Sequence, residues 1–236
     1  MNFSELHSWG LDYKGAIAIQ KELRKKLYLR SNTKKGFNIV AGADVSYMKR
    51  GDNFFSGVVV MDLRSFEVLE TAESHIRVNF PYIPGLLSFR EGPVLLMAFR
   101  KLKIVPDAVI FDGQGVAHQR GFGIASHLGL ILNIPSVGCA KSRLVGEFGE
   151  VGTERGSFTP LVYNGEKVGY VVRTKDNVKP VFISPGNMIS HEDCVELILS
   201  ATGKYRLPEP IRAAHTLVNK SRREFQKENG DARQGT

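Results

Sequence analysis

Residues 106–140 read PDAVIFDGQGVAHQRGFGIASHLGLILNIPSVGCA, and their pattern sets the architecture of the chain. The first part, PDAVIFDG (106–113), is a short apolar run of the kind found in buried strands. GIASHLGLILN (123–133) indicates a buried helix, and IPSVGCA (134–140) indicates a second strand. A strand, a helix and another strand in succession predict two parallel strands joined by a crossover helix.

Three further strands are predicted on the N-terminal side of this unit. They are FNIVAGADVSY (37–47), FFSGVVVMDL (54–63) and FEVLETAESHIRV (66–78). The links between them are short and polar, which favours an antiparallel meander. VLLMAFRKL (94–102) predicts a helix between this meander and the first parallel strand.

The two ends of the chain add helices and a hairpin. Apolar residues at helical spacing in 11–30 predict an amphipathic helix with a basic outer face, and the turn-like residues 31–36 end it. Asn164-Gly165 lies between two apolar runs and signals the type I′ turn of a hairpin.

The C-terminal region predicts two more helices. VFISPGN leads into a helix opened by Ser190, with Asp193 as its capping-box partner. A last helix begins near Pro210, and the polar residues 226–236 are expected to form a flexible tail.

These elements together predict an α/β fold of the ribonuclease H-like type. Its mixed sheet is a three-strand antiparallel meander extended by parallel strands and flanked by helices. The chain shows no internal repeat and no clear linker, so we expect a single domain over 1–236, with 1–36 as an N-terminal helix and turn.

Composition narrows the class of protein. The 236 residues are 42% hydrophobic and 24% charged, which excludes wholesale disorder. No apolar run is long enough to span a membrane, the first residues lack the pattern of a secretory signal, and two distant cysteines form no zinc ribbon or disulfide scaffold. A cytoplasmic location is expected. The net charge of +8 favours a polyanionic partner, although a generally basic protein would show the same charge.

Three carboxylates lie in unusual surroundings. Asp44 is inside the apolar strand IVAGADVSY, Asp112 closes the apolar run AVIF, and Glu91 lies in SFREGP. A carboxylate in or beside a buried strand is costly unless it meets a cation. Several such groups together are typical of a hard-cation site that hydrolyses phosphodiesters. The sequence therefore predicts a divalent-metal site made of these residues.

The same carboxylates also have local interpretations. An aspartate at a strand end often caps a turn, and Ser88 with Glu91 matches a capping box. Pro93 favours a different helix start, because proline suits the first helical position, and this would leave Glu91 outside the helix and free to coordinate. The spacing alone leaves both possibilities open.

The loop DGQGVAHQRGFGIASH (112–127) carries four glycines between a strand and a helix. Its glycine spacing fails the dinucleotide-binding fingerprint, but the backbone of such a loop approaches a ligand closely. His118 on this loop is a candidate for proton transfer or for positioning a water. His127, in the following helix, is expected to be structural.

Lys141 follows the second parallel strand and should emerge at the same sheet edge as Asp112. There it could neutralise charge that develops on a phosphate. An ordinary surface lysine is the alternative, and Cys139 is expected to be a core residue.

Residues 80–85, FPYIPG, form a stiff finger with an aromatic residue at its tip. The two prolines fix their own φ angles and bias the preceding residues toward extended conformations. Rigid aromatic or apolar wedges part stacked bases. A rigid corner with a packed tyrosine is the simpler alternative.

Taken together, these segments resemble the endonuclease V family of deoxyinosine-directed nucleases. The resemblance runs from GADVSY through PYIPGLLSFREGP and FDGQGVAHQRGFGIASHLGL to IPSVGCAKSRL, and covers about residues 37–215. It implies a ribonuclease H-like fold and a Mg²⁺ cofactor that Mn²⁺ can replace. The implied reaction hydrolyses the second phosphodiester 3′ to deoxyinosine and leaves 3′-hydroxyl and 5′-phosphate ends.

The resemblance also implies roles for individual residues of the catalytic centre. Asp44 and Asp112 match metal-binding aspartates, and Glu91 matches the third acidic residue. His118 and Lys141 match residues that assist catalysis.

Other positions match residues that contact DNA. Tyr82 matches a wedge that separates strands, and Pro81, Ile83 and Pro84 belong to the same motif. Ser184 and His215 match peripheral positions near the site, although a carboxylate would make a better ligand at His215. The residues that match the lining of a pocket for the extruded base are Leu87, Gly115, Gly123, Ile124 and Leu144.

The partner implied is DNA containing deoxyinosine, in a repair reaction carried out by a monomer. Three alternatives remain open: a nuclease specific for inosine in RNA, a structure-specific nuclease of the same fold, and a non-catalytic nucleic-acid-binding module. The presence of all three acidic residues speaks against the binding module.

Overall fold

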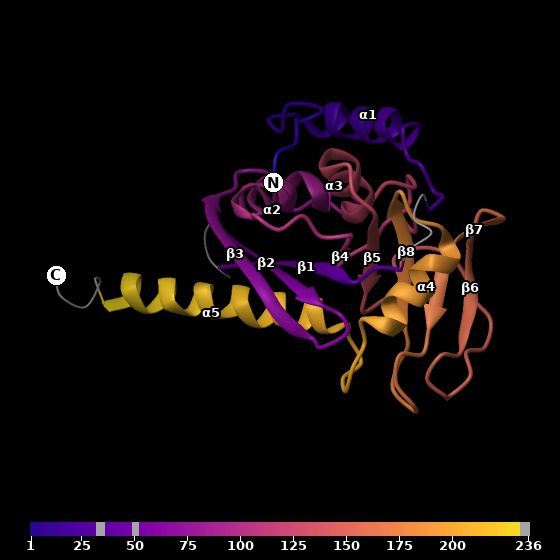
Figure 1. The fold of residues 1–236 in the computed structure, drawn as a ribbon. Coiled ribbons are helices and arrows are strands. Elements are labelled where there is room, and N and C mark those ends of the chain that lie inside the picture. The colour runs from indigo at the N-terminus through magenta and orange to yellow at the C-terminus, as the bar shows by residue number, and fades with distance from the viewer. Residues whose placement is uncertain (32–35, 49–51, 232–236) are drawn as a thin grey trace.

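The computed structural model describes residues 1–31, 36–48 and 52–231. Within these residues the strands form one eight-stranded sheet in the order β3-β2-β1-β4-β5-β8-β7-β6 (Figure 1). The strands are β1 (Ile39–Tyr47), β2 (Asn53–Asp62), β3 (Glu67–Arg77), β4 (Ala108–Phe111), β5 (Ser136–Ala140), β6 (Phe158–Tyr163), β7 (Glu166–Val172) and β8 (Val181–Asn187). The helices are α1 (Tyr13–Arg24), α2 (Leu87–Lys101), α3 (Ile124–Leu132), α4 (His191–Ser200) and α5 (Glu209–Asp231).

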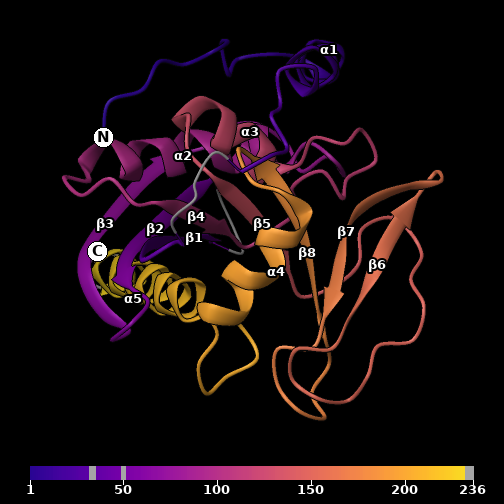
Figure 2. The same ribbon diagram turned by 45° about the vertical axis from the view of Figure 1, so that its right-hand side comes forward.

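The sheet is mixed, as the sequence predicts. β1 pairs antiparallel with β2, and β2 with β3, which confirms the meander. β4 and β5 continue the sheet parallel to β1, which confirms the crossover unit. β8, β7 and β6 complete it with antiparallel pairings, so that β3 and β6 lie at opposite edges (Figure 2).

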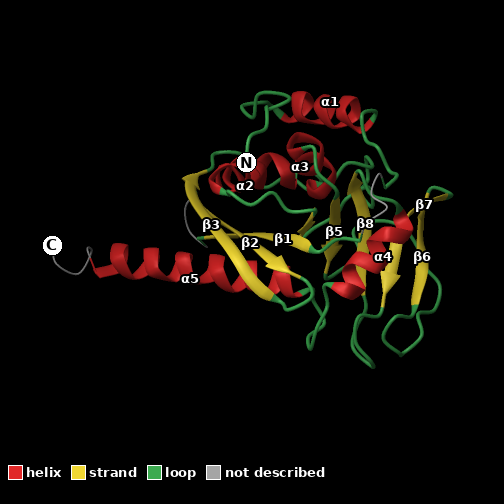
Figure 3. Ribbon diagram, in the orientation of Figure 1, coloured by secondary structure: helices red, strands yellow, loops and turns green. Residues whose placement is uncertain are grey.

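Helices cover both faces of the sheet. Ala41 and Val109 pack in one apolar cluster with α2 and α3, whereas Val40 and Ile110 pack in another with α4 and α5. Successive residues of a strand point to opposite faces, so strands covered on both sides are apolar throughout. Figure 3 shows α2 and α3 on one face, α4 and α5 on the other, and α1 outside α3.

The register of β1 and β4 brings two acidic residues together. Ala43 pairs with Phe111 in this parallel ladder, so Asp44 and Asp112 each follow the last pair. The N–H of Asp112 also donates to the carbonyl of Ala43 at 3.3 Å. Parallel strands present their carboxyl ends at one edge, where open α/β sheets bind their ligands.

Helix α2 begins earlier than the sequence predicts. It starts at Leu87, with Leu86 as an N-cap that makes no side-chain bond, and Pro93 lies inside it. Both predicted starts are therefore wrong, and Glu91 belongs to the helix. The physical reason is packing: the buried ring of Phe89 extends the apolar face of the helix toward its N-terminus, and this burial outweighs the hydrogen bond that proline removes.

Two local turn predictions are confirmed. Asn164 and Gly165 have φ angles of 53° and 80°, as a type I′ hairpin turn requires. Ser190 caps α4 by accepting the N–H of Asp193 at 3.0 Å.

The chain ends differ from the predictions in extent. α1 is shorter than the predicted helix at 11–30, and most of the predicted turn at 31–36 lies outside the described residues. The predicted tail is wrong over 226–231, which continue α5, while 232–236 lie outside the description. Phe225 explains the longer helix, because its ring packs 5.3 Å from that of Phe55 and 4.6 Å from that of His75. None of the helices described is both long and apolar enough to cross a bilayer.

Gly42 sets how closely α5 approaches the sheet. A Cβ atom at this position would lie 2.1 Å from the backbone of Pro210, where α5 begins. The first turns of α5 therefore rest directly on the backbone of β1.

Gly42→Ala should destabilise the fold by about 1–3 kcal/mol or more, because α5 must move away from β1. Gly149→Ala is the matched control, since the nearest atom to its Cβ lies 3.7 Å away. Urea unfolding followed by circular dichroism measures both variants. Equal midpoints for the two would contradict the close packing of α5.

His127 makes stability depend on pH. It is fully buried in α3, and burial, followed by the nearby His7, lowers the pKa of its ring well below the usual value. The folded chain therefore keeps this ring neutral at pH values where the unfolded chain protonates it. Stability from this group is complete above the unfolded pKa and decreases as the pH falls below it.

We expect the free energy of unfolding to fall below about pH 6.5, by up to about 1.4 kcal/mol per pH unit from this residue. Urea titrations at several pH values measure the slope. His127→Asn cannot titrate, so its slope should be smaller by this amount. An identical slope in the variant and the wild type would refute the assignment.

Candidate active site

Three carboxylates from separate elements meet where β4 ends beside β1. Asp44 is buried in β1 and Asp112 follows β4. Glu91 projects from the second turn of α2, the helix that covers this part of the sheet. The structure thus brings together the acidic residues that the sequence singles out.

The carboxylates influence one another electrostatically. Burial, followed by repulsion from Asp112, raises the pKa of Asp44. Burial, followed by repulsion from Asp44 and Asp112, raises the pKa of Glu91 to about 8. Without a cation, the edge therefore does not hold three full negative charges at neutral pH.

Two basic side chains contact the aspartates. The Lys141 Nζ donates to Asp112 Oδ2 at 2.5 Å. Burial acts to lower the pKa of Lys141, but its hydrogen bond and charge interaction with Asp112 raise it overall. Lys141 thus lies at the edge where the sequence places it.

His215 contacts Asp44 from α5. Its Nδ1 lies 2.7 Å from Asp44 Oδ2, and the amide of Asn219 donates to its Nε2 at 3.1 Å. Because Nε2 accepts a hydrogen bond, Nδ1 carries the proton and donates it to the carboxylate. His215 therefore touches the acidic cluster instead of lying at its periphery.

The acidic cluster has the chemistry of a metal site without a finished ligand cage. Among the residues described, no three His, Cys, Asp or Glu side chains are already arranged to hold an ion. The side chains available as ligands nevertheless all offer oxygens, and the raised pKa of Glu91 reflects its burial and the negative charges of Asp44 and Asp112 beside it. A divalent cation would relieve this repulsion and displace the proton of Glu91.

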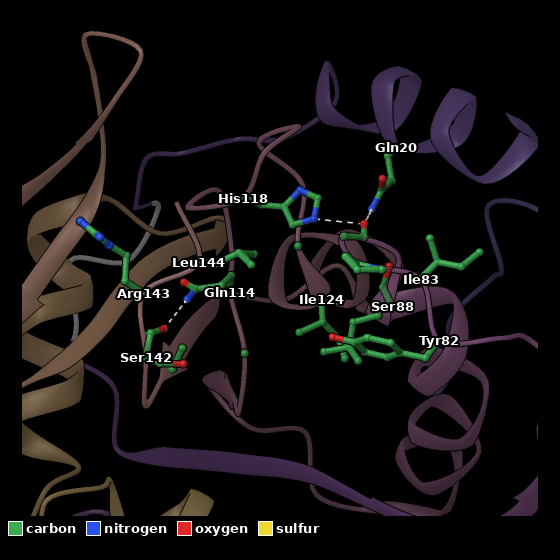
Figure 4. A pocket seen from close by; sticks show the side chains of 16 residues that line it. Gln20, Tyr82, Ile83, Ser88, Gln114, His118, Ile124, Ser142, Arg143 and Leu144 are labelled. Atoms are coloured by element: carbon green, nitrogen blue, oxygen red, sulfur yellow. Dashed lines mark hydrogen bonds between the residues drawn. The ribbon is translucent and has the colours of Figure 1, made fainter. Parts of the chain in front are cut away.

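A pocket of about 240 Å³ lies beside the acidic edge (Figure 4). Its walls share segments with the cluster, because Gly113 follows Asp112 and Ser142 follows Lys141. The predicted site residues that line it are Tyr82, Ile83, Pro84, Leu87, His118, Gly123, Ile124 and Leu144.

Among the residues predicted for the base pocket and the finger, Gly115 and Pro81 do not line this pocket. Gly115 is a correction: its N–H donates to Ser184 Oγ at 2.8 Å, and a Cβ there would lie 2.0 Å from the carbonyl oxygen of Pro185. Gly115 and the buried Ser184 therefore fix the glycine loop to β8. Pro81 lies outside the lining as well and faces a separate hollow.

The aromatic finger stands at the mouth of the pocket. Tyr82 is 67% exposed, an unusual degree for a large aromatic side chain. The guanidinium of Arg90 lies 5.7 Å from the centre of its ring. An exposed ring held on one side fits the predicted wedge better than the packed corner.

The base of this finger is held through one carbonyl oxygen. Gln20 Nε2 at 2.9 Å, His118 Nε2 at 3.1 Å and Arg120 Nη2 at 2.6 Å all donate to the carbonyl of Gly85. Gly85 has a φ of 80°, which favours glycine. Helix α1 and the glycine loop thus fix the finger together.

His118 uses both ring nitrogens in these contacts. Its Nε2–H donates to Gly85, and its Nδ1 accepts the N–H of Arg120 at 3.2 Å. Burial, followed by the charge of Arg120, lowers the pKa of His118 to about 4. The ring is neutral at neutral pH, and its contacts are those of a residue that positions the finger.

Sequence reasoning missed several residues of the site. Gln20, Arg120 and Asn219 act through contacts between segments far apart in the chain, and nothing in their local sequence announces those contacts. Gln114 could have been noticed in the sequence, because it is the one side-chain amide in the segment DGQG that follows β4.

The chain matches a family model described as Endonuclease V over residues 21–216. A curated relative from Dictyoglomus thermophilum, named Endonuclease V, is 48% identical over 92% of this chain and 94% of its own length. The crystal structure of the Streptomyces avermitilis Endonuclease V is 37% identical, with a TM-score of 0.88 over 93% of this chain and 96% of that one.

A third comparison includes a nucleic acid. The structure of Ciona intestinalis Endonuclease V, in complex with DNA containing an inosine followed by a ribo-adenosine, is 27% identical with a TM-score of 0.77, and covers 91% of this chain and 100% of that one. The family model spans most of the acidic edge, the finger and the pocket. The chain belongs to the Endonuclease V family.

Proposed function

We propose that the chain is a metal-dependent endonuclease that recognises deoxyinosine in DNA and hydrolyses the second phosphodiester on its 3′ side, leaving 3′-hydroxyl and 5′-phosphate ends. The observation that carries the proposal is the acidic cluster joined to a base-sized pocket by shared segments, Asp112–Gly113 and Lys141–Ser142. The inosine-containing DNA bound by the Ciona intestinalis relative supports this substrate.

Asp44, Glu91 and Asp112 would hold the cation in this reaction. Their oxygen donors suit Mg²⁺, with Mn²⁺ as a substitute. When bound, such an ion supplies a more acidic water and neutralises charge on the phosphate. The protein's part is to keep the three carboxylates at one edge despite their repulsion.

Lys141 and His215 orient the aspartates. The ammonium of Lys141 is bonded to Asp112 and lies at the edge where a phosphate would dock, so it is placed to neutralise developing negative charge. The Nδ1–H of His215 donates to one oxygen of Asp44 and the N–H of Val45 donates to the other, so the two contacts fix the orientation of this carboxylate.

The finger and the pocket would handle the base. Extruding a base costs a few kcal/mol, and less for a weakly paired base such as hypoxanthine. Tyr82 would fill the gap by stacking, worth about 1–3 kcal/mol per base. Lys21 and Arg24 of α1, and Lys25 at its C-cap, lie beside Arg120 on a basic surface suited to phosphates.

The function is tested with matched oligonucleotides, each incubated with and without Mg²⁺. We expect the deoxyinosine DNA strand to be incised when Mg²⁺ is present. No incision is expected in EDTA, or on a control strand that carries adenine in place of hypoxanthine. Incision of inosine-containing RNA alone would identify an inosine-specific ribonuclease instead. Incision of branched DNA without inosine would identify a structure-specific nuclease, and binding without any turnover would identify a binding module. Size-exclusion chromatography of the DNA complex tests the proposed monomer.

Asp112→Asn should lower the rate of incision at least about 100-fold, because it removes a charged donor from the cluster. Binding to deoxyinosine DNA in EDTA should persist. Asp107→Asn is the matched control. Asp107 immediately precedes β4, at the end of the strand away from Asp112, and its carboxylate accepts the N–H groups of Asn38 and Ile39. The control should incise within about twofold of the wild-type rate, and an Asp112→Asn enzyme that does the same would refute the metal role.

Tyr82→Ala should weaken binding to deoxyinosine DNA about tenfold, by the loss of stacking. Tyr82→Phe should retain the wild-type affinity, because the ring is kept. Tyr205→Ala removes another exposed tyrosine, one that stacks on Arg212, and should have no effect on affinity. Fluorescence anisotropy in EDTA measures the three affinities, and unchanged binding by Tyr82→Ala would exclude a wedge.

A further inference from the structure

A buried serine hydroxyl contributes to the wall of the pocket. Ser88 is 2% exposed and lines the cavity. In Figure 4 it lies across the pocket from Gln114 and Ser142, with Ile124 between them. Its Oγ is 2.9 Å from Nδ1 of His127, which is fully buried behind it.

A second histidine continues this chain outward. The Nε2 of His127 lies 2.6 Å from the Nε2 of His7, and the Nδ1 of His7 lies 2.8 Å from the carbonyl oxygen of Ser8. His7 belongs to the N-terminal arm, which is the segment 1–12 that precedes α1. The arm is held in place by the amino group of Met1, which donates to the carbonyl of Phe99 at 3.3 Å.

The proton positions along this chain follow from its outer end. A carbonyl oxygen only accepts, so Nδ1 of His7 carries a proton and, with both rings neutral, its Nε2 is an acceptor. His127 must then donate from Nε2, which leaves its own Nδ1 as an acceptor. Ser88 therefore donates its hydroxyl proton to His127, and Oγ can only accept a hydrogen bond from a ligand.

The other buried polar residues of the pocket donate hydrogens to carbonyls of the protein. Gln20 and His118 donate to the carbonyl of Gly85. Gln114 donates to the carbonyl of Ser142 at 3.2 Å, which fixes the orientation of its amide, and its buried Oε1 has no partner among the described residues. Opposite walls thus offer acceptors at Ser88 and Gln114.

We propose that the His7–His127–Ser88 chain makes the pocket selective for a base with a hydrogen on N1. This inference rests on the proposed function and extends it. Hypoxanthine is a lactam whose N1–H donates a hydrogen bond, whereas N1 of adenine only accepts one. Ser88 Oγ accepts the first and repels the second, since two facing acceptors share no proton. Ser88 is a specificity-determining residue, and His127 and His7 position its proton.

The test measures DNA binding in EDTA, so that no metal and no turnover contribute. Three oligonucleotides differ at one base: deoxyinosine, deoxynebularine and deoxyadenosine. Nebularine keeps the purine ring but has an accepting N1. Ser88→Ala should lose about tenfold in affinity for deoxyinosine, because N1–H of hypoxanthine loses its acceptor. Its affinity for deoxynebularine should rise, because no acceptor then faces the accepting N1.

His7→Ala tests the chain from outside the pocket. Without His7, the ring of His127 is free to carry its proton on Nδ1 and donate to Ser88, whose hydroxyl then points its proton into the pocket. Binding should weaken for deoxyinosine and strengthen for deoxynebularine, so that the ratio of the two affinities falls about tenfold. Ser126→Ala is the matched control, because Ser126 is buried next to His127 in the sequence, has no hydrogen-bond partner among the described residues and does not line the pocket.

The outcomes separate this inference from the proposed function. A wild-type protein that binds deoxyinosine and deoxyadenosine DNA equally would overturn the proposed function. If the wild-type protein prefers deoxyinosine and Ser88→Ala keeps the same preference, the selectivity assigned to Ser88 is overturned while the proposed function stands. A Ser88→Ala effect with no change in His7→Ala would overturn the proton chain. Thermal unfolding of each variant establishes that it is folded before binding is measured.

Discussion

Repulsion among three carboxylates is the constraint on which the site depends. Asp44 and Asp112 are neighbours because β1 and β4 run parallel in a fixed register, and α2 adds Glu91 from above. Burial, followed by their mutual repulsion, raises the pKa values of Asp44 and Glu91. Keeping these carboxylates together costs stability, and the apolar clusters on both faces of the sheet offset that cost. A cation turns the same repulsion into binding energy, which is how a stable sheet edge becomes a metal site.

The sequence predicted those parts of the fold that local pattern controls. The meander, the parallel strands, the hairpin turn at Asn164-Gly165 and the cap at Ser190 all follow from periodicity and turn chemistry. The errors lie where packing between distant segments decides. α2 starts before Pro93 because Phe89 is buried against other elements, and α5 continues past 226 because Phe225 packs on the meander.

The residues of the candidate site also fall into those that local sequence reveals and those that only long-range contacts reveal. Asp44 and Asp112 were identifiable because a charge within or at the end of an apolar strand is conspicuous in sequence, and Glu91 lies near enough to both for their charges to raise its pKa. Contacts over long separations were not predictable: Gln20 reaches Gly85, and His215 reaches Asp44 from α5. His118 shows the limit, since a histidine on a glycine loop suggests proton transfer until its two nitrogens are found bonded to Gly85 and Arg120.

The shared segments explain why recognition and cleavage would keep a fixed offset along the strand. Gly113 in the pocket wall is covalently next to Asp112, and Ser142 is next to Lys141. The opposite wall carries Ser88 one helical turn before Glu91. A single peptide bond joins each pocket residue to its neighbour at the acidic edge, so a base seated in the pocket would place one particular phosphodiester near the carboxylates. An enzyme built this way cuts at a set distance from the base it recognises, because that distance is a property of the backbone and not of the DNA sequence.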